Sequence, residues 1–137
     1  MARYVRFLPL LLLLFFAASC KSVDKNAPVI TNITTSSKFL AKSDCSNTSL
    51  TVTATITDDT KVKSVEIMYR VGSDQQFTSI PMKLDGHDQY TATIITLEIP
   101  GGEYGPVEFS IVAKDEAGNQ SKSAVDDSVQ LLPCVAN

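Results

Sequence analysis

From residue 28 onward the chain is a succession of short segments in which hydrophobic and polar residues alternate. The clearest segment covers residues 50–56, where every second residue is hydrophobic and the residues between are threonines. A period of two places one set of side chains on a buried face and the other in water, which is typical of a β-strand. The same period recurs over residues 65–71 and 107–113. Weaker runs cover residues 29–34, 77–84, 90–95 and 125–132.

Turn-forming residues separate these runs, and no window carries a helical stripe of hydrophobic residues. The breaks fall at Asp58-Asp59, Gly72-Ser73-Asp74, Asp85-Gly86, Pro100-Gly101-Gly102 and Ala117-Gly118-Asn119. About seven runs, with a turn every eight to twelve residues, predict an all-β fold in which two antiparallel sheets form a sandwich. A small closed barrel is the alternative.

Four stretches, residues 51–58, 62–70, 90–94 and 109–119, look like the immunoglobulin-like or fibronectin-III-like modules of bacterial surface proteins. The sequence Ala113-Lys114-Asp115-Glu116-Ala117-Gly118-Asn119 resembles the Ala-x-Asp-x-Ala-Gly-Asn turn that recurs in them before the last strand. The resemblance covers residues 27–132 and implies an immunoglobulin-like (fibronectin-III-like) sandwich over residues 28–137. Such a module specifies architecture well and ligand hardly at all.

The first 19 residues have the form of a cleaved export signal. Basic Arg3 and Arg6 precede a hydrophobic stretch that is too short for a spanning helix, which needs about 20 apolar residues. Ala17-Ala18-Ser19-Cys20 then resembles the lipobox of bacterial lipoproteins, with Ala17 where Leu is commonest. This resemblance implies cleavage before Cys20 and lipidation of Cys20, and more than one acyl chain is what stable anchoring requires. The alternative is an ordinary signal peptide that leaves Cys20 as a thiol.

Residues 20–27 are polar and without periodicity, so we expect the lipidated Cys20 and a tether to the domain. The anchor places the protein in the bacterial cell envelope. Lys21 follows Cys20 where an Asp, in some bacteria, marks retention in the inner membrane, so the outer membrane is preferred.

Charge and cysteine content narrow the environment further. The chain has 12 basic and 15 acidic residues, a net charge of −3, and loss of Arg3 and Arg6 with the signal gives −5. A surface of this sign disfavours nucleic acid as a partner. Cys45 and Cys134 remain after Cys20 is lipidated, and an even pair in an exported chain predicts a disulfide. The predicted topology places both at the same end of the sandwich.

The turns at the other end are rich in acids and suggest a metal site. Ca²⁺ prefers six to eight oxygen ligands, and Asp and Asn supply them. Solvated turns are the competing interpretation, since Asp and Asn are also the preferred turn residues. The candidate ligands are Asp58, Asp59, Asp85, Asp88, Asp115 and Asn119, with Glu116 beside them.

The opposite end is the better candidate for a partner, because the tether turns the acidic end toward the membrane. We expect contacts from Tyr104, Glu103, Gln75 and Gln76, with Tyr104 either an exposed anchor or folded back on the domain. His87 is the only histidine and sits in an apparent tight turn, and no catalytic motif or phosphate loop is present, so we expect no enzyme activity. The expected role is a binding, adhesion or assembly module, and the alternative is a structural spacer or accessory subunit.

Overall fold

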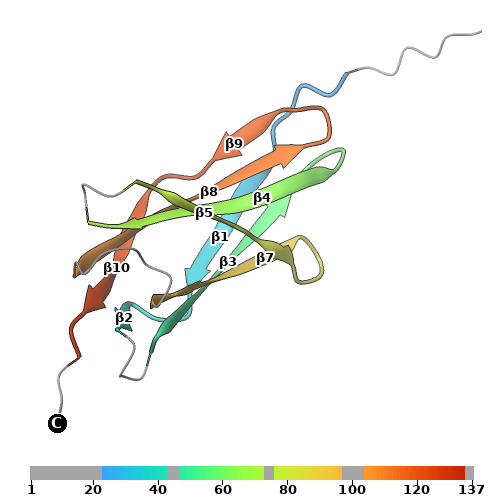
Figure 1. Cartoon of the computed structure of the whole chain (residues 1–137). Helices are drawn as coiled ribbons and strands as arrows, with labels where there is room; N and C mark the ends of the chain where they lie inside the picture. Colours follow the sequence, from blue (N-terminus) through green and yellow to red (C-terminus); the bar gives the residue numbers. More distant parts are fainter. Residues whose placement is uncertain (1–22, 43–46, 73–75, 97–103, 135–137) are drawn as a thin grey trace, which may run out of the picture.

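The computed structural model describes residues 23–42, 47–72, 76–96 and 104–134, which fold into two β-sheets (Figure 1). Ten strands lie in these residues: β1 (Val29–Thr35), β2 (Phe39–Ala41), β3 (Ser49–Thr57), β4 (Val62–Val71), β5 (Thr78–Pro81), β6 (Lys83–Leu84), β7 (Gln89–Ile95), β8 (Gly105–Asp115), β9 (Gln120–Lys122) and β10 (Asp126–Leu132). The all-β class and the two-sheet arrangement predicted from the sequence are therefore confirmed, and the arrangement is consistent with a sandwich.

The strands divide between a sheet of four and a sheet of six. The smaller sheet has the order β1-β3-β7-β6. The larger has the order β2-β10-β8-β4-β5, with β9 also paired to β8. Consecutive strands β3 and β4 lie in different sheets, as do β7 and β8, so the chain passes repeatedly between the two layers.

The buried face of each long strand is its set of alternating hydrophobic residues. Leu50, Val52, Ala54 and Ile56 of β3 have no exposed surface at all, while the threonines between them reach solvent. The larger sheet supplies the other side of the core, and its largest fully buried side chains are Tyr69 and Phe109. The alternation in the sequence thus corresponds to alternating burial along the strands.

All seven predicted runs contain strands, but one run is divided and two further strands form outside the runs. The run 77–84 divides at the buried Met82 into β5 of the larger sheet and β6 of the smaller. Two strands lie outside the predicted runs. β2 forms after β1, where the chain changes sheet, and β9 forms after the turn that ends β8. About seven strands was therefore too few.

The prediction of an entirely antiparallel sandwich was also wrong in one place. β2 runs parallel to β10, with Phe39 opposite Gln130 and Ala41 opposite Leu132. The parallel pair arises because residues 36–38 carry the chain from the edge of one sheet to the edge of the other without reversing its direction.

The two ends of the described chain lie at opposite ends of the domain (Figure 1). Residues 23–28 enter beside the turns between β3 and β4 and between β8 and β9, whereas β10 runs toward the end where β2 lies. Within the described residues, no helix has the length and apolar character needed to cross a membrane.

Candidate functional site

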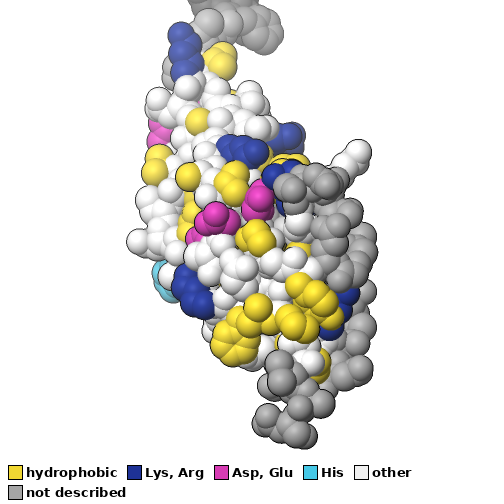
Figure 2. All heavy atoms as spheres, turned by 90° about the vertical axis from the view of Figure 1, so that its left-hand side faces the viewer, with side chains coloured by type: hydrophobic (Ala, Val, Ile, Leu, Met, Phe, Trp, Pro, Cys, Tyr) yellow, Lys and Arg dark blue, Asp and Glu magenta, His cyan; other side chains and the backbone are white. Residues whose placement is uncertain are grey.

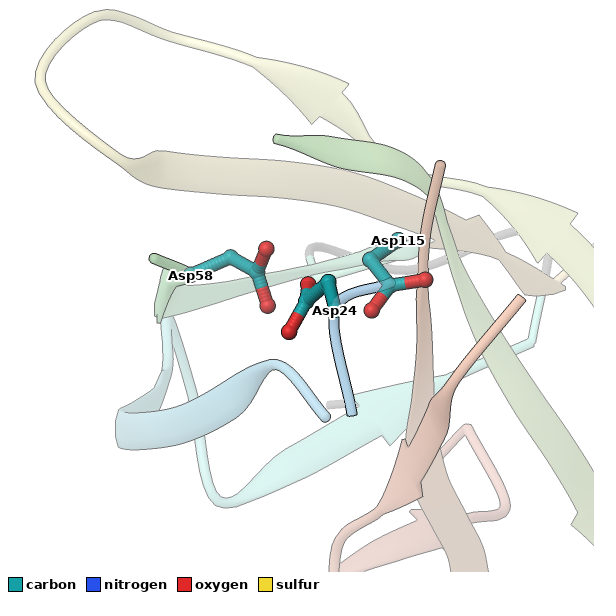
Figure 3. Close-up of side chains that lie close together, drawn as sticks. All are labelled: Asp24, Asp58 and Asp115. Atoms are coloured by element: carbon teal, nitrogen blue, oxygen red, sulfur yellow. The ribbon is translucent and has the colours of Figure 1, made fainter. Parts of the chain in front are cut away.

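The entry end of the domain carries a group of acids that we call the acidic rim: Asp24, Asp58, Asp59 and Asp115. Asp24 precedes β1, Asp58 and Asp59 follow β3, and Asp115 ends β8. Three of them, Asp24, Asp58 and Asp115, each offer a carboxylate oxygen, and these oxygens lie within 4.8 Å of one another (Figure 3). Three like charges at this spacing repel, so each needs hydrogen-bond donors.

Asp115 receives its donors from the turn that follows it. Its Oδ1 accepts the backbone N–H of Gly118 at 2.6 Å and that of Asn119 at 2.8 Å, and its Oδ2 accepts the Asn119 side-chain Nδ2–H at 2.7 Å. The residue is fully buried. Burial opposes ionisation, but the hydrogen bonds from Asn119 and the turn outweigh it and lower the pKa of the Asp115 carboxyl from its ordinary value.

Asn119 plays a different part from the one predicted. It was a candidate to present an oxygen to a cation, yet its side-chain nitrogen, not its oxygen, faces Asp115. The same Nδ2 also donates to the backbone oxygens of Asn26, at 2.9 Å, and Asp24, at 3.2 Å. Asn119 therefore joins the β8–β9 turn to the segment before β1.

Further hydrogen bonds hold this entering segment against the rim. The Thr60 hydroxyl donates to Asp24 Oδ2 at 2.9 Å, and the Asn26 Nδ2–H donates to Asp59 Oδ2 at 2.6 Å. Pro28 is buried directly after them. The second half of the predicted tether, residues 24–27, thus lies on the surface of the domain.

The other predicted ligands do not join the three clustered carboxylates. Asp59 binds Asn26, as above. Asp88 lines a shallow pocket together with Asp58 and Tyr90, and burial followed by the Asp88 charge raises the pKa of the Tyr90 hydroxyl. Asp85 lines a different groove, beside β5 and β7.

The turn that carries Asp85 and Asp88 is a tight one, as the sequence predicted. Asp85 N–H donates to the Gln89 carbonyl, and His87 and Asp88 both adopt positive φ angles, 45° and 64°. His87 lies in this turn and is exposed to solvent.

Carboxylate oxygens are ligands that suit a hard cation such as Ca²⁺. Most described oxygens of the cluster already accept hydrogen bonds from the protein. Asp58 Oδ1 accepts the Thr60 N–H and shares the single hydroxyl hydrogen of Thr60 with Asp24 Oδ2. Asp58 Oδ2 is the exception among them, because it is buried and has no hydrogen-bond partner. The rim as described favours the turn interpretation over the calcium site, which stays a prediction.

Two of the four residues predicted to bind a partner are described. Tyr104 is about half exposed, with its ring 5.3 Å from Lys42 Nζ, and Gln76 is exposed before β5. Glu103 and Gln75 lie outside the described residues, as do Cys20 and Cys45. Cys134 is exposed after β10, and its pairing with Cys45 stays a prediction.

Hydrophobic side chains gather toward the lower end of the face shown in Figure 2. Phe39 of β2 and Leu132 of β10 are nearly half exposed on these neighbouring strands, away from the acidic rim. Just before β5, the Phe77 ring lies 4.7 Å from the Arg70 guanidinium carbon and 5.9 Å from Lys122 Nζ. The Arg70 guanidinium also pairs with Glu108 Oε2 at 2.6 Å, so this face combines apolar, basic and acidic side chains (Figure 2).

Asp24 is the site residue that sequence analysis missed. It lies in a segment without periodicity, and the only signal was its acidic side chain four residues before Pro28. No protein-family model matches the chain, and no curated protein matches it. The assignment of a function therefore rests on the residues and their geometry.

Proposed function

We propose that this chain is a lipid-anchored protein of the bacterial cell envelope whose β domain is a non-catalytic binding or assembly module. The signal-like residues 1–19 and the cysteine at position 20 support the anchor. The partner is a protein or glycan that meets the surface away from the acidic rim.

One observation carries the proposal, namely the attachment of residues 24–27 to the acidic rim. Cys20 precedes Asp24 by four residues, which span at most about 14 Å when extended. A lipid on Cys20 would therefore hold the rim close to the bilayer and leave the opposite end, with Phe39, Tyr104 and Leu132, facing away from the membrane.

The order of the strands supports an immunoglobulin-like module. Such domains place their first, second, fifth and fourth strands in one sheet and their third, sixth and seventh in the other. Here β1, β3, β7 and β6 take the first set of places, and β4, β8 and β10 take the second. The resemblance at residues 113–119 falls on the end of β8 and the turn before β9, the place it occupies in those modules.

A structural spacer or accessory subunit is the second reading of the same geometry. Replacing residues 97–104, which connect β7 to β8, with a Gly/Ser linker separates the two readings. Loss of a specific envelope or host partner would favour recognition, whereas unchanged binding would favour the spacer.

The anchor itself is tested by metabolic labelling with palmitate. We expect label in the native chain and none in Cys20→Ala. Ser19→Ala is the matched control, because it keeps a small residue before the cysteine and should retain the label. Label that persists in Cys20→Ala, or is absent from the native chain, would remove the anchor from the proposal.

A further inference from the structure

One edge of the four-stranded sheet is only half covered. β6 pairs with β7 at two positions, Lys83 with Thr91 and Leu84 with Tyr90. The chain reaches β6 by crossing from the other sheet at Met82, whose N–H donates to the Val65 carbonyl. Because of this crossing, no strand among the described residues pairs with Thr93 or Ile95 on the β6 side of β7, whereas β3 pairs with both on the other side.

The backbone groups of Thr93 and Ile95 point toward this open side. Thr96 N–H donates to the Thr48 carbonyl, so the even-numbered residues of β7 face β3. Asp85 N–H donates to the Gln89 carbonyl, so the odd-numbered residues face the β6 side. The N–H and C=O of Thr93 and Ile95 consequently continue the hydrogen-bonding edge that β6 begins.

A groove of about 510 Å³ runs along this edge, between β5 and β7. Its apolar part consists of Ile80, Pro81, Leu84 and Ala92, and Leu84 is 61% exposed although it is a large hydrophobic residue. Thr93 lines the same groove, so the open backbone edge and the apolar floor are adjacent.

The edges at β5 and β1 are poorer templates for a further strand. On β5 the backbone groups of successive residues point alternately toward β4 and away from it. Met82 N–H points toward β4, so position 81 points outward, and Pro81 has no N–H to donate there. On β1 the register shifts between Thr31 and Thr34, and Asn32 has a φ of 50°. Bulges and edge prolines are ways in which natural sheets prevent strand addition.

We propose that the open edge of β7 binds an extended segment of a partner polypeptide, which adds a strand in line with β6 and antiparallel to β7. This deepens, and rests on, the binding role proposed above. The segment would exchange N–H···O=C bonds with Thr93 and Ile95 and place an apolar side chain in the groove beside Leu84. Lys83 and Asp85 at the end of the groove cancel in charge, which favours an uncharged segment.

A second copy of this chain fits the edge less well than a separate segment. Two β7 strands related by a two-fold axis would pair around Thr93, Ile94 or Ile95, and in each register the chain of the second copy runs on to the position opposite Thr91. β6 already occupies Thr91 in both. The geometry therefore points to a heterologous strand.

The test uses the full-length protein purified from membranes in detergent, and linear twelve-residue peptides displayed on phage as the probe. Selected peptides are measured against the native chain and against Thr93→Pro. This substitution removes an outward N–H and leaves the β3 ladder intact. The matched control is Ser79→Pro, which removes an outward N–H from the β5 edge instead. We expect binding to fall at least tenfold in Thr93→Pro and to be unchanged in Ser79→Pro.

Amide hydrogen exchange followed by NMR provides a readout that does not depend on the variants folding. We expect Thr93 and Ile95 to exchange rapidly in the free protein, unlike Ile94 and Thr96, and to become protected when peptide binds. Protection of Thr93 and Ile95 already in the free protein would overturn the inference, because another part of the chain then covers the edge. So would peptides that bind both proline variants equally, or a selection that yields no binder. Palmitate labelling is independent of all these outcomes, so a failure here leaves the anchor standing.

Discussion

The attachment of the entering segment to the acidic rim depends most directly on one side chain, and Asn119→Ala tests it. The Asn119 Nδ2 donates to Asp115 Oδ2 and to the backbone oxygens of Asp24 and Asn26. Alanine removes all three contacts. The backbone of Asn119 is unaffected, so its N–H continues to donate to Asp115 Oδ1.

The expected cost follows from the two hydrogens on that nitrogen. A hydrogen bond to a charged acceptor contributes about 1.5–3 kcal/mol, and the two carbonyls share a second bond of about 0.5–1.5 kcal/mol. Asn119 is only partly buried, so water replaces part of this in the variant. We therefore expect a loss of about 2 kcal/mol in the free energy of unfolding, or roughly 8 °C in melting temperature for a domain of this size.

Urea denaturation measures the loss, and limited trypsin digestion shows where it arises. Cleavage after Lys25, which lies in the attached segment, should become faster in Asn119→Ala. Gln120→Ala is the control, since its exposed side chain neighbours the same turn, and it should change neither measurement. The attachment would be refuted by a variant that unfolds at the native urea concentration and is cut after Lys25 at the native rate.

Four further outcomes are expected. Ile67→Ala should cost about 2–5 kcal/mol of unfolding free energy because it opens a cavity in the core, whereas Leu84→Ala at the exposed position should cost little; urea midpoints compare them. The pKa of Asp115 is lowered in the folded state, so its stabilisation is complete above the unfolded Asp pKa and lost as pH falls through the folded value. Asp115→Asn should flatten that acid limb in pH-dependent denaturation, and an unchanged limb would contradict the assignment. Reduction should lower the melting temperature, because a Cys45–Cys134 bond closes a loop of about 89 residues, worth up to about 4–5 kcal/mol in the chain-entropy model; no change would exclude the bond. Millimolar Ca²⁺ should leave the melting temperature unchanged, and a rise that grows with ion concentration would make the rim a cation site.

Residues whose environment is set by local alternation were predictable from the sequence. Leu50 and Ile56 are buried because a strand with one apolar face packs that face against the core. The same holds for Val107 and Ile111. The turn carrying Asp85 and Asp88 was equally predictable, since Gly and Asp tolerate the positive φ angles found at Gly86 and Asp88.

Features that depend on long-range pairing were not predictable. Asp24 joins Asp58 and Asp115 only because the chain enters the domain across the end of β3, and nothing in its local sequence encodes that path. The break at Met82 was hidden for a similar reason: its side chain is apolar as in a continuous strand, but it sits where the chain passes between the sheets. Asn119 could be recognised as a turn residue, yet the direction of its amide depends on a carboxylate and a segment from elsewhere in the chain.

The placement of the two chain ends has a mechanical consequence. A protein held at its amino terminus and gripped at its far end is pulled along β1, in the direction in which β1 runs beside β3. The hydrogen bonds between β1 and β3 would then be loaded together in shear. They would have to break simultaneously and not one after another. Such a force would first detach residues 24–27 from the rim. The contacts of Asn119 would break and the chain would lengthen slightly before the force reaches the sheet.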